Sequence, residues 1–147
     1  AHGARHGAML RQVQELYSAL ATELESHLLK EEGVLFPSIV AAEAHRQGGP
    51  EGPAAYIGSA GNLIRQMERE HERAGAVLAR SRKVTGDYVL PDDACPTFRA
   101  LYEELEHLEE DLHQHIHLEN NILFPRAITA GSAPPSNLVT LGGCGAP

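Results

Sequence analysis

The chain has 147 residues, of which 42% are hydrophobic and 22% charged, the composition of one soluble globular domain. It has no run of about 18 apolar residues, and its formal charge of −8 has the wrong sign for a protein that neutralises phosphates. Membrane insertion and nucleic-acid binding are therefore not expected. The two cysteines, Cys95 and Cys144, lie far apart, which argues against a disulfide framework or a thiolate zinc site and favours a reducing cytoplasm.

Three helical segments follow one another along the chain. The first runs from about Ala8 to Ala44 and stops at a Gly- and Pro-rich stretch, and the second runs from about Ser59 to Val84. Thr97, after Pro96, is the expected N-cap of a third helix that ends near Thr129. No strand pattern competes, so we predict an all-α, antiparallel up-down bundle over residues 1–130 and an irregular or disordered tail over 131–147.

Each predicted helix has one apolar seam with steps of three and four residues, and each seam contains ionisable residues. The seams are Leu10, Val13, Tyr17, Leu20, Leu24, His27, Glu31 and Val34; Ile57, Ala60, Ile64, Met67, His71, Ala74 and Leu78; and Leu101, Leu105, Leu108, Leu112, His115, Glu119 and Ile122. Five polar side chains should thus point inward at similar depth. Unpaired charges in a core cost several kcal/mol or more, so these residues require a compensating partner.

Two explanations for the seam residues compete. A single buried His-Glu pair is ordinary and needs only mutual hydrogen bonds. Two His-x-x-x-Glu pairs plus a third histidine instead favour a metal site, because imidazoles and carboxylates that converge from facing helices form dinuclear carboxylate centres. We expect His27, Glu31, His71, His115 and Glu119 to bind metal, with iron preferred and manganese or zinc behind it.

The chain also repeats itself around these residues. HLLKEEGVLFP, residues 27–37, and HIHLENNILFP, residues 115–125, share five of eleven positions, including the histidine, the glutamate and the Leu-Phe-Pro ending. Two helices should therefore present equivalent ligand pairs. Pro37 and Pro125 each predict a kink or an early helix end.

The other histidines are weaker candidates. His113 and His117 lie about 200° around the helix from His115 and should face solvent. His107 and His45 are also expected at the surface. His2 and His6, four residues apart at the start of the chain, are compatible with ligation, flexibility or helix surface.

These motifs resemble the hemerythrin-like di-iron proteins and, within them, the family for repair of iron centres (RIC). The likeness rests on HLLKEEGVLFP, on MEREHERAG around His71, on DDACPTFRALY and above all on DLHQHIHLENNILFPRA. It implies a four-helix bundle with a non-haem di-iron centre, bridged by Glu31 and Glu119 and ligated by His27, His71 and His115. It also implies a role in protecting or restoring iron-sulfur clusters after nitrosative or oxidative damage.

The chain departs from this pattern at its beginning. The family has a further helix there, with a fourth histidine ligand, whereas this chain starts with AHGARHGAML. The chain is then a processed or truncated fragment, or it completes its bundle as a homodimer, or His2 or His6 replaces the ligand. Without that helix, an apolar groove should be exposed and should favour self-association.

Four functions remain open on the sequence alone. The leading one is donation of iron to damaged iron-sulfur proteins. The alternatives are reversible binding or sensing of O2 or NO, reductive chemistry on nitric oxide, and an inactive bundle whose polar groups only bond to one another.

Overall fold

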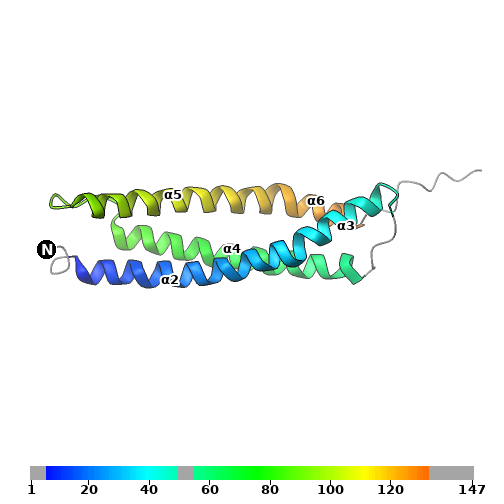
Figure 1. Ribbon diagram of the computed structural model, residues 1–147, viewed down its shortest axis with the longest axis horizontal. Helices are drawn as coiled ribbons and strands as arrows, with labels where there is room; N and C mark the ends of the chain where they lie inside the picture. The colour runs from blue at the N-terminus through cyan, green and yellow to red at the C-terminus, as the bar shows by residue number, and fades with distance from the viewer. Residues whose placement is uncertain (1–5, 50–54, 133–147) are drawn as a thin grey trace, which may run out of the picture.

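The computed structural model describes residues 6–49 and 55–132, and this part of the chain consists of helices and their connections, without a strand. The elements are α2 (Gly7–Lys30), η1 (Glu31–Leu35), α3 (Phe36–Arg46), α4 (Ala55–Thr85), α5 (Pro96–Leu118), η2 (Glu119–Leu123) and α6 (Phe124–Ser132). They form three long rods, since α2 runs through η1 into α3 and α5 runs through η2 into α6. Figure 1 shows the rods side by side with α4 running opposite to the other two, which confirms the up-down all-α fold.

The two proline motifs do not end their helices. In each case the chain first widens into one π-helical segment, in which the N–H of Phe36 bonds to the carbonyl of Glu31 and the N–H of Phe124 bonds to that of Glu119. Each proline then lies in the first turn of the next α-helix, where a missing N–H is tolerated. The kink predicted at Pro37 is visible as the change of direction between α2 and α3 in Figure 1.

The π segments correct the predicted seams. Val34 and Ile122 were expected in the core but are about half exposed, whereas Leu35 and Phe124 are fully buried. A π-helix has more residues per turn than an α-helix, so a residue three positions after the glutamate falls short of the inner face. The buried residue is therefore Leu35, one position after Val34, in the first repeat and Phe124, two positions after Ile122, in the second.

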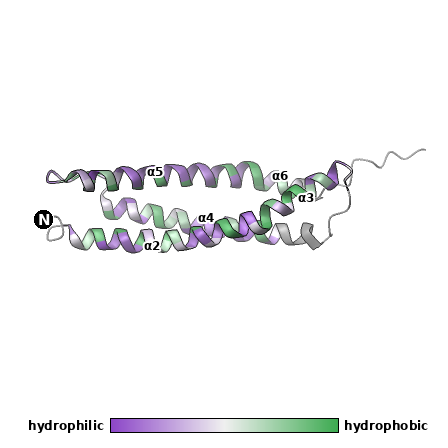
Figure 2. Cartoon of the chain, in the orientation of Figure 1, coloured by the Kyte–Doolittle hydropathy of each residue, from purple (hydrophilic) through white to green (hydrophobic). Residues whose placement is uncertain are grey.

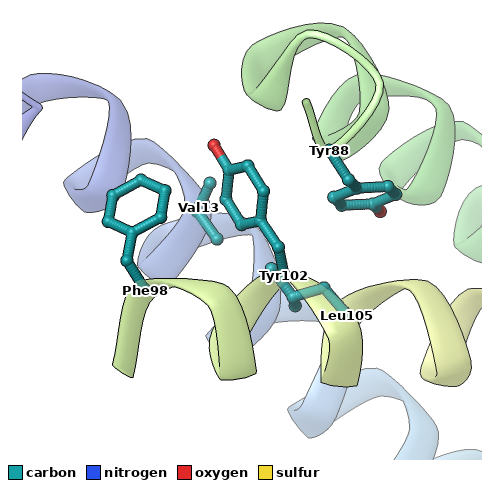
Figure 3. Close-up of a cluster of buried hydrophobic side chains, with 5 residues drawn as sticks. All are labelled: Val13, Tyr88, Phe98, Tyr102 and Leu105. Carbon is teal, nitrogen blue, oxygen red and sulfur yellow. The ribbon is translucent and has the colours of Figure 1, made fainter. Parts of the chain in front are cut away.

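Three hydrophobic clusters lie along the bundle. The first, drawn in Figure 3, joins Val13 of α2, Tyr88, and the α5 residues Phe98, Tyr102 and Leu105. The second surrounds Leu20, Ala74, Leu78 and Leu112, and the third surrounds Leu35, Ile64, Met67 and Phe124. The colours of Figure 2 show how apolar and polar residues interchange along each helix, as the seam analysis requires.

A groove separates α2 from α5. Tyr17 and Leu101, both assigned to the seams from the sequence, are 50% and 38% exposed because they line this groove. The groove has a volume of about 530 Å³, and its walls are formed by Leu10, Val13, Gln14, Tyr17, Leu101, Glu104, Leu105 and Leu108. The exposed apolar groove expected from the sequence is therefore present.

The connection from α4 to α5 differs from the expectation in one detail. Cys95, not Thr97, is the N-cap of α5, and Pro96 is its first residue, because a proline with fixed φ and no N–H suits the first helical position. Before it, Gly86, Asp87 and Tyr88 have φ values of 64°, 58° and 57°. A left-handed conformation is costly for a tyrosine, so burial of its ring must offset that cost.

Two further expectations concern the chain ends. His2 and residues 133–147 of the expected tail lie outside the described residues. Within the described ranges, none of the helices has the length and apolarity needed to cross a bilayer.

Candidate metal centre

The five residues singled out by the sequence come together in the middle of the bundle. His27 is on the last turn of α2, Glu31 begins η1, His71 is on α4, His115 is on the last turn of α5, and Glu119 begins η2. Each offers one nitrogen or oxygen atom such that all five atoms lie within 4.8 Å of one another. All are buried except His115, whose side chain is 33% exposed.

The inward-facing atoms are close together. The Nε2 atoms of His27 and His71 are 3.2 Å apart. Nε2 of His27 lies 2.9 Å from Oε1 of Glu31, and Nε2 of His71 lies 3.1 Å from Oε2 of Glu119. On the α5 side, Nε2 of His115 is 3.3 Å from the same Glu119 oxygen.

Bonds outside the cluster fix the direction of two rings. Nδ1 of His27 donates to Oε2 of Glu70 at 2.9 Å, and Nδ1 of His71 donates to Oδ1 of Asn120 at 2.8 Å. When Nδ1 holds the proton of a neutral imidazole, Nε2 presents a lone pair. In that tautomer the two Nε2 atoms, 3.2 Å apart, would share either a proton or a metal cation.

Both inner glutamates lack the partners that buried carboxylates require. Neither oxygen of Glu31 accepts a hydrogen bond from the described residues, and the same holds for Oε2 of Glu119, although imidazole nitrogens are near. Nε2 of His115 is likewise buried without a hydrogen-bond partner in this part of the chain. Buried polar atoms are normally paired, so a group of orphaned nitrogen and oxygen atoms that face one another fits a bound cation.

The electrostatics of the cluster also correspond to a cation site. Burial by itself lowers the pKa of His27, but contacts with Glu31 and Glu70 outweigh burial and raise it. The contact with Glu119 raises the pKa of His115. Burial works against ionisation of Glu119, yet the surrounding imidazoles hold its pKa well below the ordinary value. The Glu119 carboxylate thus remains anionic and attracts either protons on the histidines or a metal ion.

Comparison with known proteins agrees with this geometry. Residues 1–127 match the family described as the hemerythrin HHE cation binding domain. The chain belongs to this hemerythrin family. It is also similar to three proteins named iron-sulfur cluster repair protein YtfE, from Dickeya chrysanthemi (42% identity), Edwardsiella ictaluri (43%) and Salmonella paratyphi B (37%). These matches cover 72%, 75% and 80% of the chain but only 42%, 44% and 48% of the relatives, so the chain spans less than half the length of each.

His6 does not lie in the metal centre of the hemerythrin domain. Its Nε2 contacts Asp93 at 3.1 Å, and its ring meets Phe98 edge-on, at the end of the bundle where α5 begins. His6 precedes His27 by 21 positions, about 30 Å along a helix. The option that His6 is a ligand of this centre is therefore wrong for this structure.

The other histidines mostly follow the expectation. His107, His113 and His117 are exposed, as the helical phase predicts. His45 was expected at the surface but is partly buried, with a buried Nδ1, because α3 packs against α6.

Several residues around the centre were not identified from the sequence. Glu70 bonds to the ring of His27 and not to that of its sequence neighbour His71. Asn120, Lys30 and Gln66 were missed. Glu70 and Asn120 each directly adjoin a cluster residue, which is the one sequence signal that could have drawn attention to both.

A small apolar cavity adjoins the cluster. It accommodates one water-sized sphere, about 10 Å³, and is lined by Leu20, Glu23, Leu24, His27, Glu70, His71, Ala74, Leu112, His115 and Ile116. A volume of this size holds one small molecule next to the imidazoles.

Proposed function

We propose that the hemerythrin domain holds two iron ions with His27, Glu31, His71, His115 and Glu119 and donates iron to damaged iron-sulfur proteins in the cytoplasm. The observation that carries the proposal is the 3.2 Å approach of the Nε2 atoms of His27 and His71, beside carboxylate oxygens without hydrogen bonds. Imidazole and carboxylate ligands suit iron, with manganese and zinc as competitors. The relatives named iron-sulfur cluster repair proteins support the repair role.

The residues of the cluster divide the work in this proposal. The three neutral imidazoles and two carboxylates bind the ions, and iron supplies the capacity to bind a small diatomic molecule or to be transferred to an acceptor. Glu31 and Glu119 would supply the two carboxylates, since they enter the cluster from two different rods of the bundle. Glu70 and Asn120 hold the rings of His27 and His71 in the orientation that binding needs.

The test measures metal content and transfer together. We expect about two irons per chain after anaerobic loading, and recovery of an iron-sulfur protein depleted of iron when the loaded chain is added. His27→Ala should lower both. His113→Ala is the matched control, because His113 is exposed and two positions from His115. A loaded chain that supplies no iron to the acceptor would contradict the donor role.

The small apolar cavity favours a second function, binding of O2 or NO at the same centre. The cavity adjoins the imidazoles and leaves room for a ligand about the size of one water molecule. A binding or sensing module retains its iron in the presence of a chelator and binds the gas reversibly, whereas a nitric oxide reductase turns over with an electron donor. Gas titration followed by absorbance, with iron content measured afterwards, separates these alternatives from donation.

A homodimer that covers the α2–α5 groove is also part of the proposal. The groove exposes Tyr17 and Leu101, and apolar surfaces of this kind usually bind a partner. Light scattering should give twice the chain mass for the unmodified protein and the single-chain mass for Tyr17→Glu. A monomer for both would exclude self-association through this groove.

A further inference from the structure

The three histidines of the cluster are supported very unequally from outside. His27 donates to Glu70, whose other oxygen accepts from Lys30 at 2.6 Å and from Gln66 at 3.0 Å. Hydrogen bonds to an ionised carboxylate are stronger than those to a neutral group, so this is the firmest of the three supports. The pKa of Glu70 is lowered to about 2, because those hydrogen bonds outweigh the effect of burial.

The other two histidines form a graded series with His27. His71 donates to a neutral amide, that of Asn120, and its ring stacks on Phe124 at an interplanar angle of 4°. For Nδ1 of His115 the described part of the chain provides no hydrogen-bond partner. The His115 side chain is 33% exposed, against 3% for His27 and 4% for His71.

The positions of the rings separate the cluster into two ends. The Nε2 atoms of His27 and His71 are near enough for one ion with metal–nitrogen bonds of about 2.1 Å to bind both. The His115 ring lies about one ångström farther away: its centroid is 6.1 Å from that of His27 and 5.9 Å from that of His71, whereas the His27 and His71 centroids are 4.9 Å apart. Among the described residues, one end therefore has two well-supported imidazoles, and the other has one exposed imidazole.

We propose that the centre retains its two ions unequally: the ion at His27 and His71 is held, and the ion at His115 is the one that exchanges. This inference rests on the proposed function and specifies which part of the centre supplies the iron. A ring that is fixed from outside stays oriented towards its ion, whereas an exposed ring can rotate away. Glu70 is thus a positioning residue for retention.

The exchanging end is also the more accessible one. Because the His115 side chain is 33% exposed, an ion that leaves this end has direct access to solvent.

The test follows iron release from the anaerobically loaded 147-residue chain into an excess of a ferrous chelator, by stopped-flow absorbance. We expect two phases, each of about one ion per chain. Glu70→Gln should accelerate the slow phase by about tenfold and leave the fast phase unchanged. His115→Ala should remove the fast phase and leave about one slowly released ion. Glu72→Gln, an exposed glutamate on the same helix, is the matched control and should change neither phase.

The outcomes distinguish this inference from the function on which it rests. A chain that binds fewer than two ions overturns the dinuclear proposal and this inference with it. Two ions that leave in a single phase, or a Glu70→Gln variant that accelerates the fast phase as much as the slow one, overturn only unequal retention. A circular dichroism spectrum of His115→Ala that matches the unmodified chain shows that a lost phase is not a lost fold.

Discussion

Two kinds of buried glutamate lie on one rod of the bundle. Glu109 of α5 accepts from Arg82 at 2.8 Å and from the hydroxyl of Tyr88 at 2.8 Å. Glu119, ten residues further along, is equally buried but has an oxygen without a hydrogen bond, and both oxygens of Glu31 lack one. Burial alone does not distinguish a structural carboxylate from a candidate ligand. The two differ in the number of hydrogen-bond donors that the fold supplies to each carboxylate.

The same contrast distinguishes two regions of the molecule. Near the α4–α5 connection, the protein satisfies its own buried charge, and Tyr88 packs against Tyr102 and beneath Arg82. At the candidate metal centre the surrounding bonds go to the outer ring nitrogens, and several inner atoms are left unpaired. The first region is complete as folded, whereas the second has the unpaired ligand atoms that a cation would satisfy.

Glu31→Gln should have the largest effect, and this effect should be on metal binding. We expect iron content to fall from about two ions per chain to one or fewer, because an amide cannot bridge two cations as a carboxylate does. The metal-free variant should be slightly less stable than the parent below about pH 6.5, since Glu31 lies 2.9 Å from Nε2 of His27 and stabilises its protonated form. Plasma mass spectrometry and urea unfolding provide the two measurements. If the variant still binds two irons, Glu31 is not a metal ligand.

A rise in pH should lower the stability of the metal-free chain and raise its affinity for metal. The pKa values of His27 and His115 are raised above 6.5 in the metal-free fold, so their stabilising effect is full below about pH 6.5 and is lost as pH rises through the folded values. Metal binding must displace those protons, so its affinity should rise over the same interval, by up to about tenfold per pH unit for each proton displaced.

Thermal unfolding and metal titration at about pH 6 and about pH 8 check both directions. The metal-free melting temperature should be higher at the lower pH, with affinity higher at the upper one. Equal metal affinity at the two pH values would mean that metal binding does not displace protons from the histidines.

Glu109→Gln should destabilise the fold and leave the metal content unchanged. We expect a loss of about 2 kcal/mol, below the roughly 3–5 kcal/mol of a fully buried pair, because Arg82 is partly exposed. Urea unfolding of the metal-free chain measures it, with the exposed neighbour Glu110→Gln as control. Loss of iron together with stability would show that the Glu109–Arg82 pair and the metal centre are coupled.

Tyr88→Phe, in the same region as Glu109, should give the smallest loss of stability. Removal of the hydroxyl leaves one Glu109 oxygen without its donor, at a cost of about 1 kcal/mol. Tyr17→Phe serves as the control because Tyr17 is half exposed in the groove. An unchanged unfolding midpoint for Tyr88→Phe would mean that Arg82 alone satisfies Glu109.

Much of the fold could be predicted because helical periodicity is a local signal. The seam of α4 is buried at Ile64, Met67, His71, Ala74 and Leu78, as predicted from the three-four spacing. The π segments could not be predicted from periodicity, since they change the number of residues per turn at Glu31 and Glu119. For that reason Val34 and Ile122 were assigned to the core in place of Leu35 and Phe124.

The polar cluster was predictable for a similar reason, and its environment was not. His27, His71 and His115 interrupt apolar seams, which shows from spacing alone that they face inward. That Glu109 is buried and paired depends on Arg82 and on Tyr88, which belong to a different helix and to the connection after it. No spacing along α5 encodes those partners.

By itself, the sequence determined the three helical rods, the inward side of each rod and the residue types that meet at the centre, because these follow from local geometry. The tertiary structure alone decided which ring nitrogen faces inward, which carboxylates lack donors and that His6 lies at the far end. These properties depend on contacts between helices, such as His27 with Glu70, whose partners are separated by tens of residues and meet only in the assembled bundle.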